Sequence, residues 1–343
     1  VYMCYIFQKV SALKSLDVSN FHTSKVMKMA FMFADCNNLE YLDVSKFDTE
    51  NVIEMGNMFQ TCISLTSLDV SNFNTKNVEG LGMMFEDCNS LKKLDVSKFD
   101  TKKVKDMSYM FANCFELTSL EVSRFDTSNV EDMAGMFQGM KSLERLDVRN
   151  FVTSKVKDME MMFQSCTKLT SLSIKNFDTS EVEDFYAMFD YCTDVTSLDI
   201  SNFNTAKAVD MSMMFRYCSS LTSLDFSKFD TSKVEDMEEM FTSCSNIEKL
   251  DLSSFRTSEV RNMKRMFFIC AKLNSLDVSN FDTSKVEDME YMFSNCLSLG
   301  TLDLSSFVTS KVRNMNGMFR YGSILKFLDI SKFDTKNVED MGN

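Results

Sequence analysis

The apolar positions of this sequence recur with a fixed period of 26 residues. The leucine that opens each Leu-Asp-Val-Ser-like stretch stands at Leu16, Leu42, Leu68 and onward to Leu328, with no insertion or deletion between copies. A constant period of this length is typical of stacked supersecondary units, each too small to bury its apolar face alone. We therefore predict a repeat solenoid of about thirteen copies.

Two segments of each copy have different hydrophobic periods. Residues 66–71 alternate, with Leu68 and Val70 on one face and Asp69 on the other, which predicts a short strand with one buried side. In residues 231–241 the apolar side chains recur at every third or fourth position, which predicts a short amphipathic helix. Four copies place a serine and a glutamate at the spacing of a helix capping box: Ser128/Glu131, Ser180/Glu183, Ser232/Glu235 and Ser284/Glu287.

The order strand, turn, helix, turn predicts an α/β fold. We expect a right-handed parallel solenoid with strands on the inner face and short helices outside. Because helices are ~10 Å wide and paired strands lie ~4.8 Å apart, the stack should curve. The chain has no proline, nine glycines and no linker-like segment, so residues 1–343 should form one solenoid domain. Neither end has a polar capping unit, so we expect a segment of a longer protein.

Equivalent residues of successive copies form columns, and several columns are nearly invariant. Phenylalanine fills two of them, from Phe7 to Phe319 and from Phe21 to Phe333, and we expect these rings to stack in the core. A third column, Thr23 to Thr335, is threonine throughout. We expect its hydroxyls to hydrogen-bond a turn or to begin the helix cap.

Ten of the eleven cysteines occupy one further column: Cys36, Cys62, Cys88, Cys114, Cys166, Cys192, Cys218, Cys244, Cys270 and Cys296. Three interpretations are open: buried free thiols, disulfides between adjacent copies, or metal ligands. Helices pack ~9–10 Å apart, whereas a disulfide needs Cα atoms within ~7 Å, so free thiols are favoured. No Cys-x-x-Cys or Cys/His pair exists to supply metal ligands.

The composition of the chain limits which partners and which kinds of chemistry are expected. The net charge is −13 with no large basic cluster, so nucleic acid is not an expected partner. No run approaches the ~18 apolar residues of a membrane span, so direct membrane insertion is not expected. His22 is the only histidine and stands where other copies vary, and no phosphate-binding motif is present. We predict no enzyme activity and no cofactor.

The repeat unit L-x-S-L-D-V-S-x-F-D-T-S-x-V-x-D-M-x-x-M-F-x-x-C resembles the 26-residue repeat of the BspA-like leucine-rich repeat surface proteins. The resemblance covers essentially the whole chain. It implies a leucine-rich-repeat fold and a location outside the cell or on its surface. It also implies adhesion to host or matrix proteins, glycans or other cell surfaces, without catalytic residues.

The exposed side of the predicted strands, which we call the strand face, carries a row of carboxylates. Its members are Asp17, Asp43, Asp69, Asp95, Asp147, Asp199, Asp225, Asp251, Asp277, Asp303 and Asp329, with Glu121 and Ser173 as substitutions. Like charges ~4.8 Å apart need compensation. Hydrogen bonds from the neighbouring serines would provide it, and calcium is the alternative.

One part of this face differs from the rest. Arg145 and Arg149 stand where serine is usual, Ser173 replaces aspartate, and Lys175 replaces serine. These substitutions either compensate Asp147 locally or form a specific contact site for a partner. Tyr41 and Phe327 are exposed aromatic candidates on the same face.

The sequence supports two functions. The first is a non-enzymatic binding or adhesion module that recognises protein or glycan partners through its strand face. The alternative is a structural spacer, coat or filament-forming protein whose copies self-associate end to end.

Overall fold

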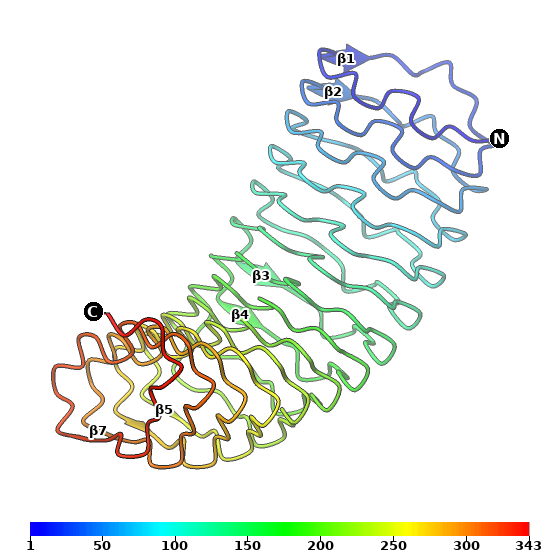
Figure 1. Cartoon of the computed structure of the whole chain (residues 1–343). Coiled ribbons are helices and arrows are strands. Elements are labelled where there is room, and N and C mark those ends of the chain that lie inside the picture. Colours follow the sequence, from blue (N-terminus) through cyan, green and yellow to red (C-terminus); the bar gives the residue numbers. More distant parts are fainter. Residues whose placement is uncertain (343) are drawn as a thin grey trace. The chain divides into compact units, whose positions relative to one another are not determined.

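The computed structural model describes residues 1–342 (Figure 1). The chain divides into two compact units, Val1–Phe177 and Asp178–Asn343, and each unit is a stack of equivalent 26-residue copies. The prediction of one domain over residues 1–343 stays a prediction, as do the right-handed sense and the curvature. Asn343 lies outside the described residues.

Short parallel strands confirm the predicted stacking. The first unit contains β1 (Ser15–Leu16), β2 (Tyr41–Leu42), β3 (Arg145–Leu146) and β4 (Ser171–Leu172), with β1 pairing β2 and β3 pairing β4. The second unit contains β5 (Lys249–Leu250), β6 (Ser275–Leu276), β7 (Thr301–Asp303) and β8 (Phe327–Asp329), with β5 pairing β6 and β7 pairing β8. All four pairs are parallel and in register.

The prediction of a strand over residues 66–71 is wrong. The burial of these residues alternates as expected, with Leu68 and Val70 buried and Asp69 exposed, but no strand forms there. The chain turns too early, because the Ser71 N–H donates to Oδ1 of Asp69 at 2.9 Å and the Phe73 N–H donates to the Val70 carbonyl at 3.0 Å. A turn at this position leaves room for strands of only two or three residues.

The predicted helices are absent from residues 1–342, so the α/β class is wrong. In residues 237–244 the N–H groups of Glu239, Phe241 and Ser243 donate to carbonyls of the next copy at 2.7–3.0 Å. The intervening N–H groups of Thr242 and Cys244 donate three residues back, at 2.9 and 3.1 Å. We call this part of each copy the turn segment. Its backbone donors serve the neighbouring copy and are unavailable for a helix.

Positive φ angles accompany this winding. In the same copy Glu239 and Ser243 have φ of 55° and 61°, and the equivalent residues of other copies take similar values. Left-handed residues four apart break a helical path. The predicted capping boxes are also wrong, because the Ser232 N–H is bound by Oδ1 of Asp230 at 3.0 Å.

A second parallel edge runs along each unit, and we call it the bridge edge. Single-residue bridges join Tyr2, Lys28, Glu54, Gly80, Asp106, Asp132 and Asp158 in the first unit. They join Asp184, Asp210, Asp236, Asn262, Asp288, Asn314 and Asp340 in the second. We call the part of each copy that carries or aligns with the short strands the strand segment. The apolar core of each unit therefore lies between the strand segment, the bridge edge and the turn segment.

The core columns pack as the sequence predicts. Rings of one phenylalanine column stack in parallel, as Phe33 and Phe59 do with centroids 5.7 Å apart, and both are fully buried. The threonine column links copies: the Thr231 hydroxyl donates to the Arg256 carbonyl at 2.8 Å and accepts from the Arg256 N–H at 2.7 Å. The hydroxyl therefore bridges two copies and does not cap a turn or a helix of its own copy.

All eleven cysteines are free in the structure, and those of the column are buried. The Cys166 thiol donates to the Phe137 carbonyl at 3.1 Å, and the same bond recurs in other copies. Burial raises the pKa of Cys166 and Cys244 to about 12. Of the three interpretations of this column, the structure has the buried free thiols.

Candidate functional site

The carboxylate row of the strand face is held by local hydrogen bonds. Asp95 accepts the Ser97 hydroxyl at 2.6 Å and the Ser97 N–H at 2.9 Å on the same oxygen. These two bonds lower the pKa of Asp95. Backbone N–H bonds of the same kind recur along the row, so the serine compensation expected from the sequence is present. Among residues 1–342, no group of three or more His, Cys, Asp or Glu side chains could hold a metal ion.

The structure brings four of the predicted residues together. The register of β3 and β4 pairs Arg145 with Ser171, so the residues that follow, up to Arg149 and Lys175, lie on adjacent copies of the strand face. Arg145, Arg149, Ser173 and Lys175 are all exposed. We call these four residues the basic cluster.

Within the basic cluster, Arg149 compensates Asp147. Its Nε and Nη2 atoms donate to the two carboxylate oxygens at 2.9 and 2.7 Å. Arg149 thereby lowers the pKa of Asp147 to about 2. Both side chains are exposed, so this pair adds little to stability.

Arg145 differs from Arg149. It is exposed and, among the described residues, its guanidinium makes no hydrogen bond or ion pair. Local compensation therefore accounts for Arg149 but not for Arg145.

The two aromatic candidates lie apart from the basic cluster. Tyr41 begins β2, which pairs with β1, and its side chain is 61% exposed. Phe327 begins β8 in the second unit and is 55% exposed. The structure leaves both as isolated exposed rings.

Sequence reasoning missed a half-buried acidic cluster on the bridge edge. Asp106, Asp132, Asp158 and Glu160 lie on adjacent copies, and burial followed by repulsion from the other three raises the pKa of Asp132 to about 6. The Tyr109 hydroxyl donates to Oε1 of Glu160 at 2.6 Å. The 26-residue spacing of the aspartates was visible in the sequence, but their burial was not.

A second missed cluster lies on the turn segment of the other unit. Arg216 donates from Nε and Nη2 to both oxygens of Asp190 at 2.9 Å, and from Nη1 to Oε2 of Glu239 at 2.9 Å. Its guanidinium also lies 5.5 and 5.8 Å from the ring centroids of Tyr191 and Tyr217. Asp190 is 1% and Glu239 is 7% exposed, so the two carboxylates that bond Arg216 are buried.

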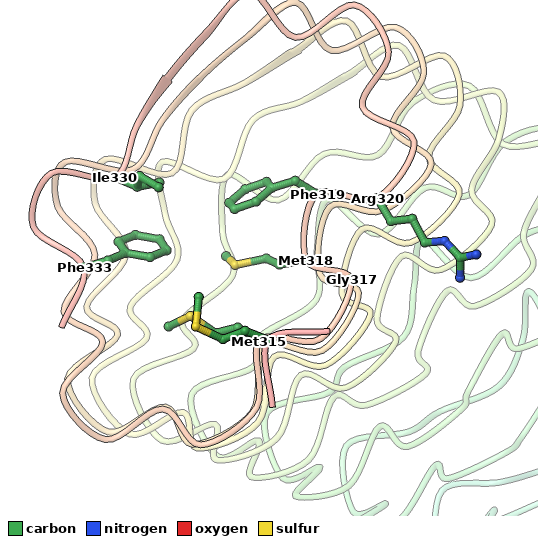
Figure 2. A pocket seen from close by; sticks show the side chains of 8 residues that line it. Met315, Gly317, Met318, Phe319, Arg320, Ile330 and Phe333 are labelled. Atoms are coloured by element: carbon green, nitrogen blue, oxygen red, sulfur yellow. The ribbon is translucent and has the colours of Figure 1, made fainter. Parts of the chain in front are cut away.

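A pocket of about 310 Å³ opens beside Met315, Met318, Phe319, Ile330 and Phe333 (Figure 2). The Phe319 and Phe333 side chains point toward each other across it, whereas Arg320 points away. These residues belong to the columns that form the core of preceding copies. Among the described residues that line it, the only charged side chain is that of Arg320, so the pocket continues the core.

The only histidine of the sequence and the cysteine column lie in different surroundings. His22 is exposed, and the cysteine column is buried with raised pKa values. No helix among residues 1–342 has the length and apolar character required to cross a membrane.

The sequence matches the model of one protein family along its whole length. The family described as "Mycoplasma protein of unknown function, DUF285" matches in four overlapping segments, residues 1–118, 83–198, 170–275 and 235–343. No curated protein matches the sequence.

Several solved structures are similar at low identity. A leucine-rich repeat protein from Bacteroides ovatus is 16% identical, with 89% of this chain and 88% of that chain covered and a TM-score of 0.35. A leucine-rich cell surface protein from Faecalibacterium prausnitzii is 14% identical, with 94% and 82% covered and a TM-score of 0.40. An internalin, InlF, from Listeria monocytogenes is 16% identical, with 93% and 87% covered and a TM-score of 0.26.

Proposed function

This chain belongs to the DUF285 family, and we propose that it is a non-enzymatic module that binds protein or glycan partners through its strand face. The module would act outside the cell or on its surface, as the resemblance to BspA-like repeats implies. Host proteins, matrix proteins and other cell surfaces are the partners that this location offers.

The observation that carries the proposal is the contrast between the buried and the exposed positions of the strand segment. The residues beneath the face are buried apolar side chains that keep the same positions from copy to copy, such as Leu146 and Val148. The exposed residues above them follow a common Ser, Asp, Ser pattern in most copies, and four departures from that pattern fall on two adjacent copies, in the basic cluster. A rigid scaffold that presents variable side chains at fixed positions is suited to recognition.

The test compares a variant that restores the common pattern with a control. The variant carries Arg145→Ser, Arg149→Ser, Ser173→Asp and Lys175→Ser, and the control carries Lys105→Ser and Lys157→Ser on the bridge edge of the same unit. Biolayer interferometry against a panel of matrix proteins and mucin glycans measures binding. We expect the variant to lose a response that the control keeps. A response that both variants keep would contradict the proposal.

Light scattering over a hundredfold concentration range distinguishes the binding module from the structural alternative, which is end-to-end self-association. A binding module should keep a constant mass near 39.4 kDa. Mass that grows with concentration would favour the spacer or filament.

A further inference from the structure

We propose that Arg145, flanked by serine hydroxyls, binds the carboxylates of a short acidic segment of a protein partner. The inference rests on the proposed binding function and specifies the chemistry of the partner. It concerns one point on the strand face, and the rest of that face would supply complementary contacts.

Arg145 is an exposed cation without an ion pair among the described residues, as are Lys93 and Lys249 at the same position of other copies, and it is the one arginine of the three. Lys14 of the first copy bonds Glu40 at 3.1 Å, and Arg149 bonds Asp147 at 2.7 Å. Arg145 has no such partner among the described residues, although it is exposed at the start of β3. A guanidinium in this state offers its full planar fork to a carboxylate.

The side chains beside Arg145 are small and can hydrogen-bond. Ser171 is its register partner in β4, and Ser119 holds the same position in the preceding copy. Neighbouring copies lie ~4.8 Å apart, so both hydroxyls flank the base of the Arg145 side chain. A hydroxyl donates to a carboxylate as readily as it does to a water molecule. The three residues thus offer a guanidinium and two further donors to one bound segment.

The nearby negative charges are partly neutralised. Asp147 is held by Arg149, and the next place in the carboxylate row is Ser173, which carries no charge. Lys175 adds a cation two residues further along the same copy. Glu144 is exposed beside Arg145 and is the one neighbouring carboxylate of its copy without an ion pair among the described residues. The basic cluster therefore attracts an anion in a chain whose net charge is −13.

The extent of the basic cluster indicates whether its ligand is a short acidic segment or a long polyanion. It covers two copies, which at ~4.8 Å per copy gives room for one or two carboxylates. Toward the N-terminus it is bordered by Glu121 and Asp95, both exposed and both with lowered pKa values. A sulfated glycan that followed the face would meet these charges and be repelled. A short acidic peptide segment would not extend that far.

The experiment uses the full chain and fluorescence anisotropy. The probe is a fluorescein-labelled Gly-Ser peptide that carries two adjacent glutamates, and the same peptide with glutamines is the reference. Arg145→Ser introduces the residue that several other copies have at this position, so the fold should be retained, and circular dichroism verifies it. Lys93→Ser is the matched control, because Lys93 occupies the same position two copies earlier, beside Asp95.

We expect the glutamate peptide to bind more tightly than the glutamine peptide and Arg145→Ser to weaken it about tenfold. Ser173→Asp, which restores the carboxylate row, should also weaken it, and Lys93→Ser should change it less than about twofold. Equal affinity for the two peptides, or equal losses in Arg145→Ser and Lys93→Ser, would overturn the inference. So would tighter, Arg145-dependent binding of a heparin oligosaccharide, which would identify a glycan site. Loss of peptide binding alone would leave the proposed function intact if matrix-protein binding still required the strand face.

Discussion

Tyr109 reaches across two copies of the repeat and donates its hydroxyl to Oε1 of Glu160 at 2.6 Å. The ring passes over Gly135, the intervening residue of the same column, where a Cβ would lie 2.3 Å from two ring carbons. Gly135 has a φ of 55°, but Ala187 occupies the same column at 51°, so the backbone angle alone does not demand glycine. The ring of Tyr109 is what requires glycine at this position.

Gly135→Ala should therefore destabilise the protein by about 1–3 kcal/mol, the usual range for overpacking a close contact. Chemical denaturation followed by circular dichroism measures the free energy of unfolding. In a Tyr109→Ala background the same substitution should cost much less, because the ring that it meets is gone. Equal costs in the two backgrounds would show that φ, and not the ring, requires glycine.

The half-buried Asp132 predicts a pH dependence of stability. Its pKa in the folded chain is about 6 against 3.8 for the free side chain, so ionisation is unfavourable in the native state. Its contribution is fully present below pH 3.8 and is lost as the pH rises through 6. Asp132→Asn should raise the free energy of unfolding at pH 8 and leave it nearly unchanged at pH 4.

Asp95 provides the control of opposite sign. Its pKa is lowered by the bonds from Ser97, so its contribution is present above pH 3.8 and is lost as the pH falls through its folded pKa. Asp95→Asn should lower the free energy of unfolding slightly near pH 7 and less as the pH falls below 3.8. An identical pH profile for the two variants would refute the environment assigned to Asp132.

The buried Arg216 network predicts a large stability effect. Arg216→Ala removes the guanidinium that bonds both oxygens of Asp190, which is 1% exposed, whereas Glu239 keeps its ion pair with Arg265 at 3.2 Å. Breaking a buried ion pair by removing one partner costs about 3–5 kcal/mol. Thermal unfolding of the variant measures the loss.

A surface pair serves as the comparison. Lys105 and Glu79 form an ion pair at 3.3 Å with both side chains more than half exposed. Lys105→Ala should cost no more than about 1 kcal/mol. If Arg216→Ala proved equally mild, the Arg216 network would not be buried as described.

The cysteine column predicts selective thiol reactivity. The column thiols are buried and Cys166 has a pKa of about 12, so few thiolates exist at pH 8 and reagents cannot reach them. Cys4 is partly exposed. Iodoacetamide should modify Cys4 in the native chain and all eleven cysteines in denaturant, as counted by mass spectrometry. Rapid native labelling of Cys166 would contradict this.

The sequence predicted the period, the parallel register and the buried columns because each depends on a pattern repeated in every copy. It predicted a helix over residues 231–241 because apolar residues three or four apart suit a helix as well as they suit a winding turn. The choice between these depends on where the N–H of Glu239 finds its acceptor, and that acceptor, the Lys264 carbonyl, belongs to the next copy. A pattern within one copy does not contain this information.

The candidate residues of the strand face were predicted on the same basis. Alternation places Arg145 and Arg149 on the exposed side, and the period places Ser173 and Lys175 beside them. The pairing of Arg149 with Asp147, which leaves Arg145 alone, depends on side-chain geometry. The Arg216 network was missed because its members vary within their columns, and only their burial identifies them.

The uniform contacts between copies also bear on how such a gene can change. Equivalent points of most copies, such as Phe33 and Phe59, are bounded by the same stacking partners, threonine bridges and thiol bonds. Unequal recombination that removes or duplicates one whole copy would join surfaces that already fit. The length of the chain can therefore drift in whole steps while folding is retained, and each step changes how far Arg145 lies from every feature beyond the join.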